Sequence, residues 1–365
     1  MRKKHFLFAS VLALLCGSSA LHAQDFKLTS SGYFKNQGVD IMAFDDIYPE
    51  GHQGGVCIIM NGHRVATNGD IRLEATPGQW QPVPKQLDRK LGDNSITATL
   101  CYPDSSRHLT GFNPMIYPDL HLIYTVNVES KGKNIEVTVD LDRPIPQEFI
   151  GKVGFNLEFF PGSLFGKPWI MDGQSGIFPQ QPNSPLMTTQ PNYLHTGNYH
   201  DGKQSLADMD KLIGKGYSPI VADDIISEPY AKGRKFTSRP DDPYNKVTIE
   251  SLSGDLQLFD GRMNHNNGWF VLRSNIKPGV TKGAVKWIIT PNVVADWMYQ
   301  PVIQTSQIGY HPTQDKEAVI EMDIRDNRKE TAQIIRIDAD GEKVVKNVTP
   351  ANWGKFLRYN YLKVD

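Results

Sequence analysis

The sequence predicts an all-β protein in which a large antiparallel β-sandwich precedes a smaller β domain. Short runs rich in β-branched and aromatic residues recur from residue 27 to residue 300, separated by polar or glycine-containing turns. Glycine and proline are frequent, at 31 and 24 of 365 residues, whereas helix-type runs are rare. Because roughly nine or more strands follow one another, we expect sheet packed on sheet, with mostly antiparallel neighbours.

Residues 1–23 have the pattern of a secretory signal peptide. Basic residues at positions 2–4 precede an apolar segment over 6–15, which is too short to cross a bilayer as a helix. We expect cleavage after Ala23, with Ala20 as the alternative. The protein is therefore expected to be exported to the periplasm, the cell surface or the medium.

Composition excludes some partners and leaves one question of anchoring open. Cys16 raises the alternative of a lipoprotein, but Leu15 is larger than the small residue that usually precedes a lipidated cysteine. No later apolar run reaches the ~18 residues of a membrane helix. With 39 basic and 40 acidic residues the net charge is −1. We therefore expect neither a membrane span nor a nucleic-acid partner.

Residues 24–300 predict the large sandwich, with long loops at its centre. Its clearest strand, 134–141, alternates apolar and polar residues, as a strand with one solvated face does. The segment 162–202 is crowded with Gly, Pro, Asn and Gln and predicts an ordered loop system, with a short helix over 205–213 after it. The other expected strands are 56–60, 95–102, 121–128, 153–160, 246–252, 268–274 and 284–290.

Four aromatic residues are candidates for stacking on sugar rings, because flat exposed rings cover the apolar faces of sugars. The alternative is that they anchor the loops to the sandwich. These candidates are Trp80, Trp169, Tyr193 and Tyr199. Three other tryptophans, Trp269, Trp287 and Trp297, lie in or beside expected strands and are predicted to be core residues.

No catalytic residue, metal site or cofactor is predicted. The doublets Asp45-Asp46, Asp223-Asp224 and Asp241-Asp242 are poor acid/base pairs, because neighbouring residues on a strand point to opposite faces. His195, His200 and Asp201 share the central loops without a diagnostic ligand spacing.

Cys57 and Cys101 lie in strand-like runs. The exported compartment would permit a disulfide between them. Buried free thiols are the favoured interpretation, because cysteine packs well as a small hydrophobe.

Residues 301–365 predict a second β domain. Alternation over 317–324 and 332–338 predicts two strands, and Asp340-Gly341 predicts a hairpin turn into a third. The pattern is that of an immunoglobulin-like sandwich, which needs about seven strands and about 100 residues. Fewer residues are present, so we expect an incomplete sandwich.

One motif in this domain resembles a known family. The segment QIGYHP at 307–312, then Lys316 and AVI at 318–320, is similar to the opening of the immunoglobulin-like N-terminal domain of family-9 glycoside hydrolases, the cellulase family. That domain opens with Asn-Gln-x-Gly-Tyr-x-Pro, and Ser306 replaces the Asn here. The resemblance covers residues 301–365, less than a fifth of the chain.

The resemblance implies an exported N-terminal accessory region of a polysaccharide hydrolase acting on plant β-glucans. In that family a helical barrel with two catalytic carboxylates follows the immunoglobulin-like domain. The chain ends at Asp365 before any such barrel, so we expect a truncated protein or a separately encoded catalytic domain as partner. Two alternatives remain open: a free-standing glycan-binding protein, and a carbohydrate-active enzyme acting through the large sandwich.

Overall fold

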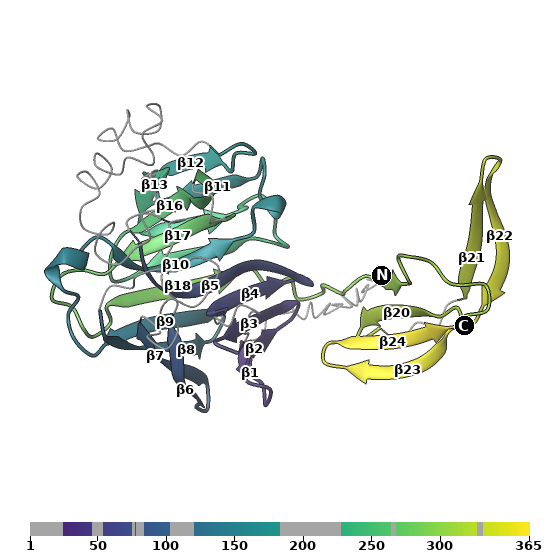
Figure 1. Cartoon of the computed structure of the whole chain (residues 1–365), viewed down its shortest axis with the longest axis horizontal. Helices are drawn as coiled ribbons and strands as arrows, with labels where there is room; N and C mark the ends of the chain where they lie inside the picture. Colours follow the sequence, from purple (N-terminus) through teal and green to yellow (C-terminus); the bar gives the residue numbers. More distant parts are fainter. Residues whose placement is uncertain are drawn as a thin grey trace, which may run out of the picture.

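The computed structural model describes eight parts of the chain, and Figure 1 shows their arrangement. They are residues 25–45, 54–74, 77, 84–102, 120–182, 228–263, 268–326 and 331–365. The expected signal peptide with Cys16, the expected helix over 205–213, and the candidates Trp80, Tyr193, Tyr199, His195, His200 and Asp201 lie outside the described residues. Among those described there is no α-helix, and so none long and apolar enough to cross a membrane.

The large domain consists of two nine-stranded sheets whose strand pairs are antiparallel. The first sheet has the order β1 (Lys27–Leu28), β2 (Phe34–Asn36), β3 (Val39–Ala43), β4 (Val56–Met60), β5 (His63–Leu73), β10 (Val153–Phe159), β17 (Phe270–Asn275), β16 (Leu256–Asp260) and β13 (Ala231–Gly233). The second has the order β12 (Gln174–Ile177), β11 (Pro168–Met171), β14 (Lys235–Ser238), β15 (Val247–Ser251), β18 (Val285–Pro291), β9 (Asn134–Leu141), β8 (Leu122–Lys131), β7 (Ser95–Tyr102) and β6 (Lys85–Leu91). The predicted all-β sandwich is confirmed.

One continuous hydrophobic core fills the large domain. Alternate residues of both sheets supply it, as the strand period requires. At its centre Trp287 of β18 meets Phe155 of β10 edge to face, with ring centroids 5.0 Å apart. The indole N–H of Trp287 donates to Ser274 Oγ at 3.0 Å, so its one polar atom is satisfied. The prediction that Trp287 is a core residue is confirmed.

Both cysteines are free thiols, as the favoured interpretation expected. Cys57 is fully buried in β4, where its Sγ lies 3.1 Å from the Gly54 carbonyl oxygen and 3.1 Å from Thr67 Oγ1. Cys101 is half-buried on β7 in the second sheet. The two cysteines thus belong to opposite sheets of the sandwich.

Residues 301–365 form a small domain of a different shape from a closed sandwich. A four-stranded sheet has the order β19 (Val302–Gln304), β20 (Ala318–Asp323), β24 (Tyr359–Val364) and β23 (Ala351–Phe356). A separate hairpin, β21 (Ala332–Asp338) and β22 (Gly341–Val348), projects away from it (Figure 1). Four buried side chains form the core: Ile320, Met322, Leu362 and Val364.

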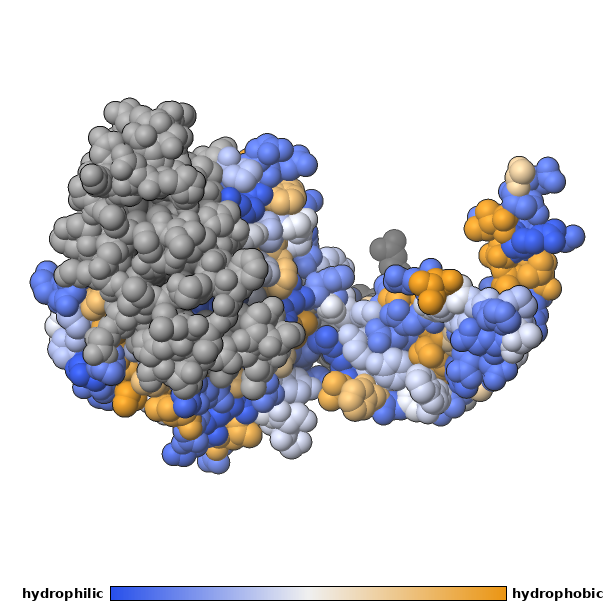
Figure 2. All heavy atoms as spheres, in the orientation of Figure 1, coloured by the Kyte–Doolittle hydropathy of each residue, from blue (hydrophilic) through white to orange (hydrophobic). Residues whose placement is uncertain are grey.

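The projecting hairpin leaves apolar side chains in solvent, and Figure 2 shows them along its length. Ile337 is 75% exposed and Val345 is 52% exposed. Strands with unpaired edges and few buried apolar contacts unfold locally more readily than core strands. We therefore expect protease to cut residues 301–365 before the described strands of the large domain. Limited proteolysis followed by mass spectrometry measures this. Equal resistance of both domains would contradict it.

Candidate functional site

A row of polar side chains follows β5 on the side of the strand opposite its core residues. Ile71 and Leu73 belong to the hydrophobic core, and the side chains at alternate positions point the other way. Residues from β10 and β17 continue the row across the sheet. We call this set the polar cluster: Asn68, Asp70, Arg72, Glu74, Asn156, Glu158 and Arg273, of which none is more than 8% exposed.

Arg273 and Glu74 form the centre of the polar cluster. Arg273 Nη1 donates to Glu74 Oε1 at 3.2 Å and to Asn156 Oδ1 at 3.1 Å. Its Nη2 donates to the carbonyl oxygens of Glu74 and Lys152, at 3.1 and 2.9 Å. Asn156 Nδ2 donates to the same Glu74 Oε1 at 2.5 Å. The guanidinium and the amide are therefore fixed by several hydrogen bonds each.

Glu74 has one carboxylate oxygen in use and one available. Its Oε2 is buried and has no hydrogen-bond partner among the described residues. Burial raises the pKa of Glu74 to about 7; Arg273 and the hydrogen bond from Asn156 oppose this rise, and Glu158 adds to it. A carboxyl group with a pKa near neutrality can both give and take a proton under physiological conditions.

A second carboxyl group of the polar cluster has a raised pKa. Burial raises the pKa of Asp70 to about 6, against the attraction of Arg72 and a hydrogen bond from Tyr124. The Tyr124 hydroxyl donates to Asp70 Oδ1 at 2.8 Å. Tyr124 belongs to β8 of the second sheet. It contacts β5 beyond Gly69, the last residue of β5 that pairs with β4. Asp70 is thus held from both sheets.

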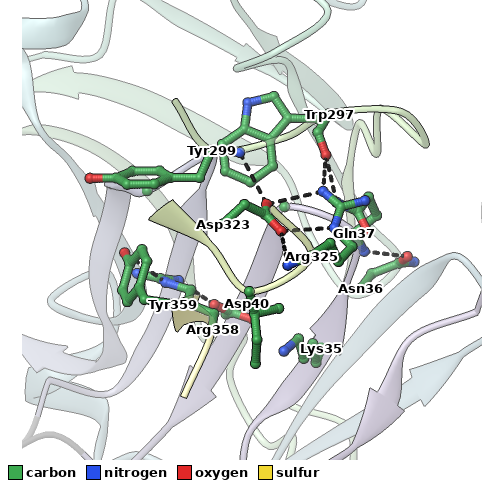
Figure 3. Close-up of a pocket in the computed structure, with 13 residues that line it drawn as sticks. Lys35, Asn36, Gln37, Asp40, Trp297, Tyr299, Asp323, Arg325, Arg358 and Tyr359 are labelled. Atoms are coloured by element: carbon green, nitrogen blue, oxygen red, sulfur yellow. Dashed lines mark hydrogen bonds and ion pairs between the residues drawn. The ribbon is translucent and has the colours of Figure 1, made fainter. Parts of the chain in front are cut away.

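A pocket lies where the small domain meets the large one, and Figure 3 shows its side chains. Its volume is about 180 Å³. We call it the junction pocket. Its lining comes from strands β2 and β3, two glycine turns, the segment after β18, the end of β20 with the residues after it, and the start of β24 with the residue before it. The lining residues are Lys35, Asn36, Gln37, Gly38, Asp40, Gly62, Trp297, Tyr299, Asp323, Ile324, Arg325, Arg358 and Tyr359.

Two aromatic rings pack the segment that joins β18 to β19, residues 292–301, onto the large domain. Trp297 lies over Gly38, where an added Cβ would come within 2.7 Å of the indole ring. Tyr299 lies over Gly62, where an added Cβ would come within 3.0 Å of the phenol ring. Both glycines also have positive φ, at +66° and +86°, which few other residues adopt without strain. Both Gly38 and Gly62 are therefore positions that require glycine.

Ion pairs and hydrogen bonds close the rest of the junction. Arg358 of the small domain pairs with Asp40 of β3. Gln37 Nε2 donates to the Trp297 carbonyl oxygen at 2.7 Å. Burial raises the pKa of Asp323, but hydrogen bonds from Arg325 and from the Tyr299 N–H outweigh it and hold this pKa at about 2. Asp323 is therefore an anion throughout the physiological range.

The structure describes one of the four aromatic candidates. Trp169, on β11, is only 6% exposed and belongs to the hydrophobic core. Its ring lies against Gly176 of β12, where an added Cβ would come within 2.5 Å of Trp169 Cζ2. Stacking on a sugar needs an exposed ring face, so this position fits the alternative role of an anchor.

We expect Trp169→Ala to lower the free energy of unfolding by about 3–5 kcal/mol, because it empties a buried aromatic site. Thermal melts and polysaccharide retention, measured side by side, test this. Trp353→Ala is the control, because Trp353 is 63% exposed and should cost less than about 1 kcal/mol. Weaker retention at unchanged stability for Trp169→Ala would support stacking instead.

Trp297 was predicted to be a core residue, and that prediction is wrong. It is half-buried and lines the junction pocket, because it follows β18 and packs on a turn of the other sheet. Asp242, of the doublet Asp241-Asp242, accepts hydrogen bonds from the Tyr244 N–H at 2.8 Å and from Asn245 Nδ2 at 3.0 Å. Among the described residues no group of three or more His, Cys, Asp or Glu could hold a metal ion.

Sequence reasoning missed the polar cluster. The segment 63–73 was not recognised as a strand, because its apolar residues do not dominate. One available signal was the alternation of Asn68, Asp70, Arg72 and Glu74 with the apolar Ile71 and Leu73. The contribution of Arg273 had no local signal, since it lies 199 residues from Glu74.

Comparisons with known proteins give distant structural similarities. No family model matches the chain, and no curated protein matches it. A galactose mutarotase related enzyme from Lactobacillus acidophilus is 10% identical with a TM-score of 0.35, over 71% of this chain and 96% of that one. A galactose mutarotase-like protein from Lactobacillus casei is 10% identical with a TM-score of 0.33, over 73% of this chain and 98% of that one.

A heparan sulfate lyase from Pedobacter heparinus is also similar. It is 10% identical with a TM-score of 0.28, over 87% of this chain but only 41% of that one. At such identities and scores we draw no functional conclusion from any of the three. The family-9 glycoside hydrolases expected from residues 301–365 are not among these similar structures.

Proposed function

We propose that the protein is a carbohydrate-active enzyme whose large sandwich binds a sugar at the polar cluster, with Glu74 as the group that exchanges a proton with it. The observation that carries this proposal is the burial, the raised pKa and, within the described part of the chain, the unpaired oxygen of Glu74. It is a buried carboxyl group with a pKa of about 7, with one oxygen fixed by Arg273 and Asn156 and the other without a partner among the described residues.

The energetics favour a functional role over a purely structural one. Three carboxyl groups, Asp70, Glu74 and Glu158, share the polar cluster with two guanidinium groups. Burying charged groups costs free energy that ion pairing often fails to return, so such a cluster is weak evidence for stability. Strongly perturbed carboxyl groups concentrate at functional sites.

The donors and acceptors of the polar cluster suit sugar hydroxyl groups. A hydroxyl group both donates and accepts a hydrogen bond. Asn68 Oδ1 is buried without a hydrogen-bond partner among the described residues, while its Nδ2 donates to Glu158 Oε2 at 2.6 Å. Two acceptors, Asn68 Oδ1 and Glu74 Oε2, are therefore available for ligand hydroxyl groups. Glu74 would act as general base when ionised and as general acid when protonated.

The test is to follow neutral and acidic mono- and oligosaccharides by proton NMR with the 365-residue protein. We expect a change in anomeric equilibration or in bond cleavage for at least one of them, lowered by about 10²–10⁴-fold in Glu74→Gln. The matched control is Glu250→Gln, since Glu250 lies half-exposed on β15 in the other sheet. Equal activity of Glu74→Gln and wild type would contradict a role for Glu74.

A second candidate function rests on the small domain. We propose that residues 301–365 join the large sandwich to a polysaccharide hydrolase, as the resemblance to family-9 glycoside hydrolases implies. The exposed apolar side chains of β21 and β22 favour this, because uncovered patches of this kind mark contact surfaces. Retention of the protein on β-glucan, together with a purified family-9 catalytic domain but not without it, would support this function.

A further inference from the structure

The junction pocket is small. Its volume is about 180 Å³. It is smaller than the pockets of drug-sized ligands. Three aromatic side chains line it: Trp297, Tyr299 and Tyr359. Tyr299 meets both others edge to face, with ring centroids 6.3 Å from Trp297 and 5.1 Å from Tyr359.

Two of the three cations that line the junction pocket are already paired. Arg325 holds Asp323 with two hydrogen bonds, Nε to Oδ1 at 2.8 Å and Nη2 to Oδ2 at 3.0 Å. Arg358 pairs with Asp40. These pairs are formed before any ligand arrives and leave no net charge between them.

Lys35 is the third cation and carries the positive charge that remains. It lies directly opposite Asp40 in the β2–β3 register, so both side chains point to the same face. Asp40 pairs with Arg358. Lys35 also attracts the Asp40 carboxylate, although it forms no ion pair within 4.0 Å among the described residues. Figure 3 shows Lys35 among the side chains that line the pocket, next to Asp40.

We propose that the junction pocket binds one acidic sugar ring of the hexuronate class, with its apolar face against Trp297 and its carboxylate on Lys35. Aromatic rings cover the C–H face of a pyranose, and a charge-assisted hydrogen bond from the lysine holds the carboxylate. Both domains supply lining residues, so the ring binds only when the two domains are docked. This site is separate from the polar cluster and does not depend on the function proposed for it.

The experiment titrates the 365-residue protein with sodium glucuronate, and with glucose as the neutral counterpart, by isothermal calorimetry and saturation-transfer NMR. We expect saturable binding of glucuronate and binding of glucose that is at least about tenfold weaker. Lys35→Met should lower the affinity for glucuronate by about 10- to 100-fold, and Lys35→Arg should restore it. The control Lys232→Met removes an exposed cation from β13, at the opposite edge of the same sheet, and should have no effect.

Three results would overturn the inference. They are the absence of saturable glucuronate binding, equal affinity for glucose and glucuronate, and equal loss of affinity in Lys35→Met and Lys232→Met. Thermal melts of each variant show whether it is folded, and Lys35→Arg reports on the charge even if Lys35→Met unfolds. Glucuronate binding that persists in Glu74→Gln separates the junction pocket from the polar cluster, whereas its loss there would assign the sugar to the polar cluster instead.

Discussion

Replacing Arg273 by methionine is expected to lower the free energy of unfolding by about 3–5 kcal/mol. The guanidinium is 1% exposed and donates to Glu74, to Asn156 and to two backbone carbonyl groups. Methionine nearly fills the same volume but leaves the Glu74 carboxyl group and these acceptors buried without their donor. Losing one partner of a buried pair costs more than the pair contributed, because the remaining charge is uncompensated.

Chemical denaturation at pH 7 measures this effect. Arg336→Met is the matched control, because Arg336 pairs with Asp338 on the exposed hairpin, where ion pairs contribute about 0–1 kcal/mol. Double replacement of Arg273 and Glu74 by methionine should recover part of the loss, since it removes both charges together. A loss below about 1 kcal/mol for Arg273→Met would show that the guanidinium does not hold the polar cluster together.

The free energy of unfolding is expected to fall as the pH rises from about 4.5 to 7, by up to about 3 kcal/mol. The pKa of Glu74 is raised from 4.5 to about 7 in the folded protein. Between these values the folded state keeps a proton that the unfolded state has lost, so deprotonation favours unfolding. Below this range both states are protonated at Glu74, and above it both are ionised.

Asp70 contributes in the same direction at lower pH, because its pKa is raised from 3.8 to about 6. The variants Glu74→Gln and Asp70→Asn therefore separate the two groups. In Asp70→Asn the slope between pH 6 and 7 should remain, whereas in Glu74→Gln that slope should vanish. Denaturant titrations at half-unit pH intervals measure it. A stability that is flat from pH 5 to 7.5 in the wild type would show that Glu74 keeps an ordinary pKa.

The strands that the sequence predicted share one property. The segments 56–60, 95–102 and 134–141 have the bounds of β4, β7 and β9 in the structure, because their buried residues are apolar. The strand β5 was missed although residues 65–73 are all buried. Apolar periodicity indicates a strand whose buried residues are apolar. In β5 the buried residues include the charged Asp70 and Arg72. A strand whose buried residues include charged groups is hidden from such a pattern for this reason.

The junction pocket was out of reach of the sequence for a different reason. Gln37 and Trp297 are 260 residues apart, and nothing local to either indicates the contact. Gly38 and Gly62 have the pattern of ordinary turn residues, since their contacts with Trp297 and Tyr299 depend on a segment that comes much later in the chain. The packing of one domain on another therefore had no sequence signal, whereas the strands within each domain did.

The strand order has a consequence for how the chain reaches its native state. In the first sheet β10 lies between β5 and β17, and in the second sheet β9 lies between β8 and β18. Neither nine-stranded sheet can be completed until residues 270–291 have been synthesised. Their strands, β17 and β18, must then pair with β10 and β9, which are formed from residues 134–159. Chains dominated by such distant pairings fold on the scale of milliseconds to seconds, because the entropy of long loops is lost before the contacts form. The first half of the polypeptide therefore emerges from the ribosome with open strand edges on β9 and β10, and it needs protection from self-association during that interval.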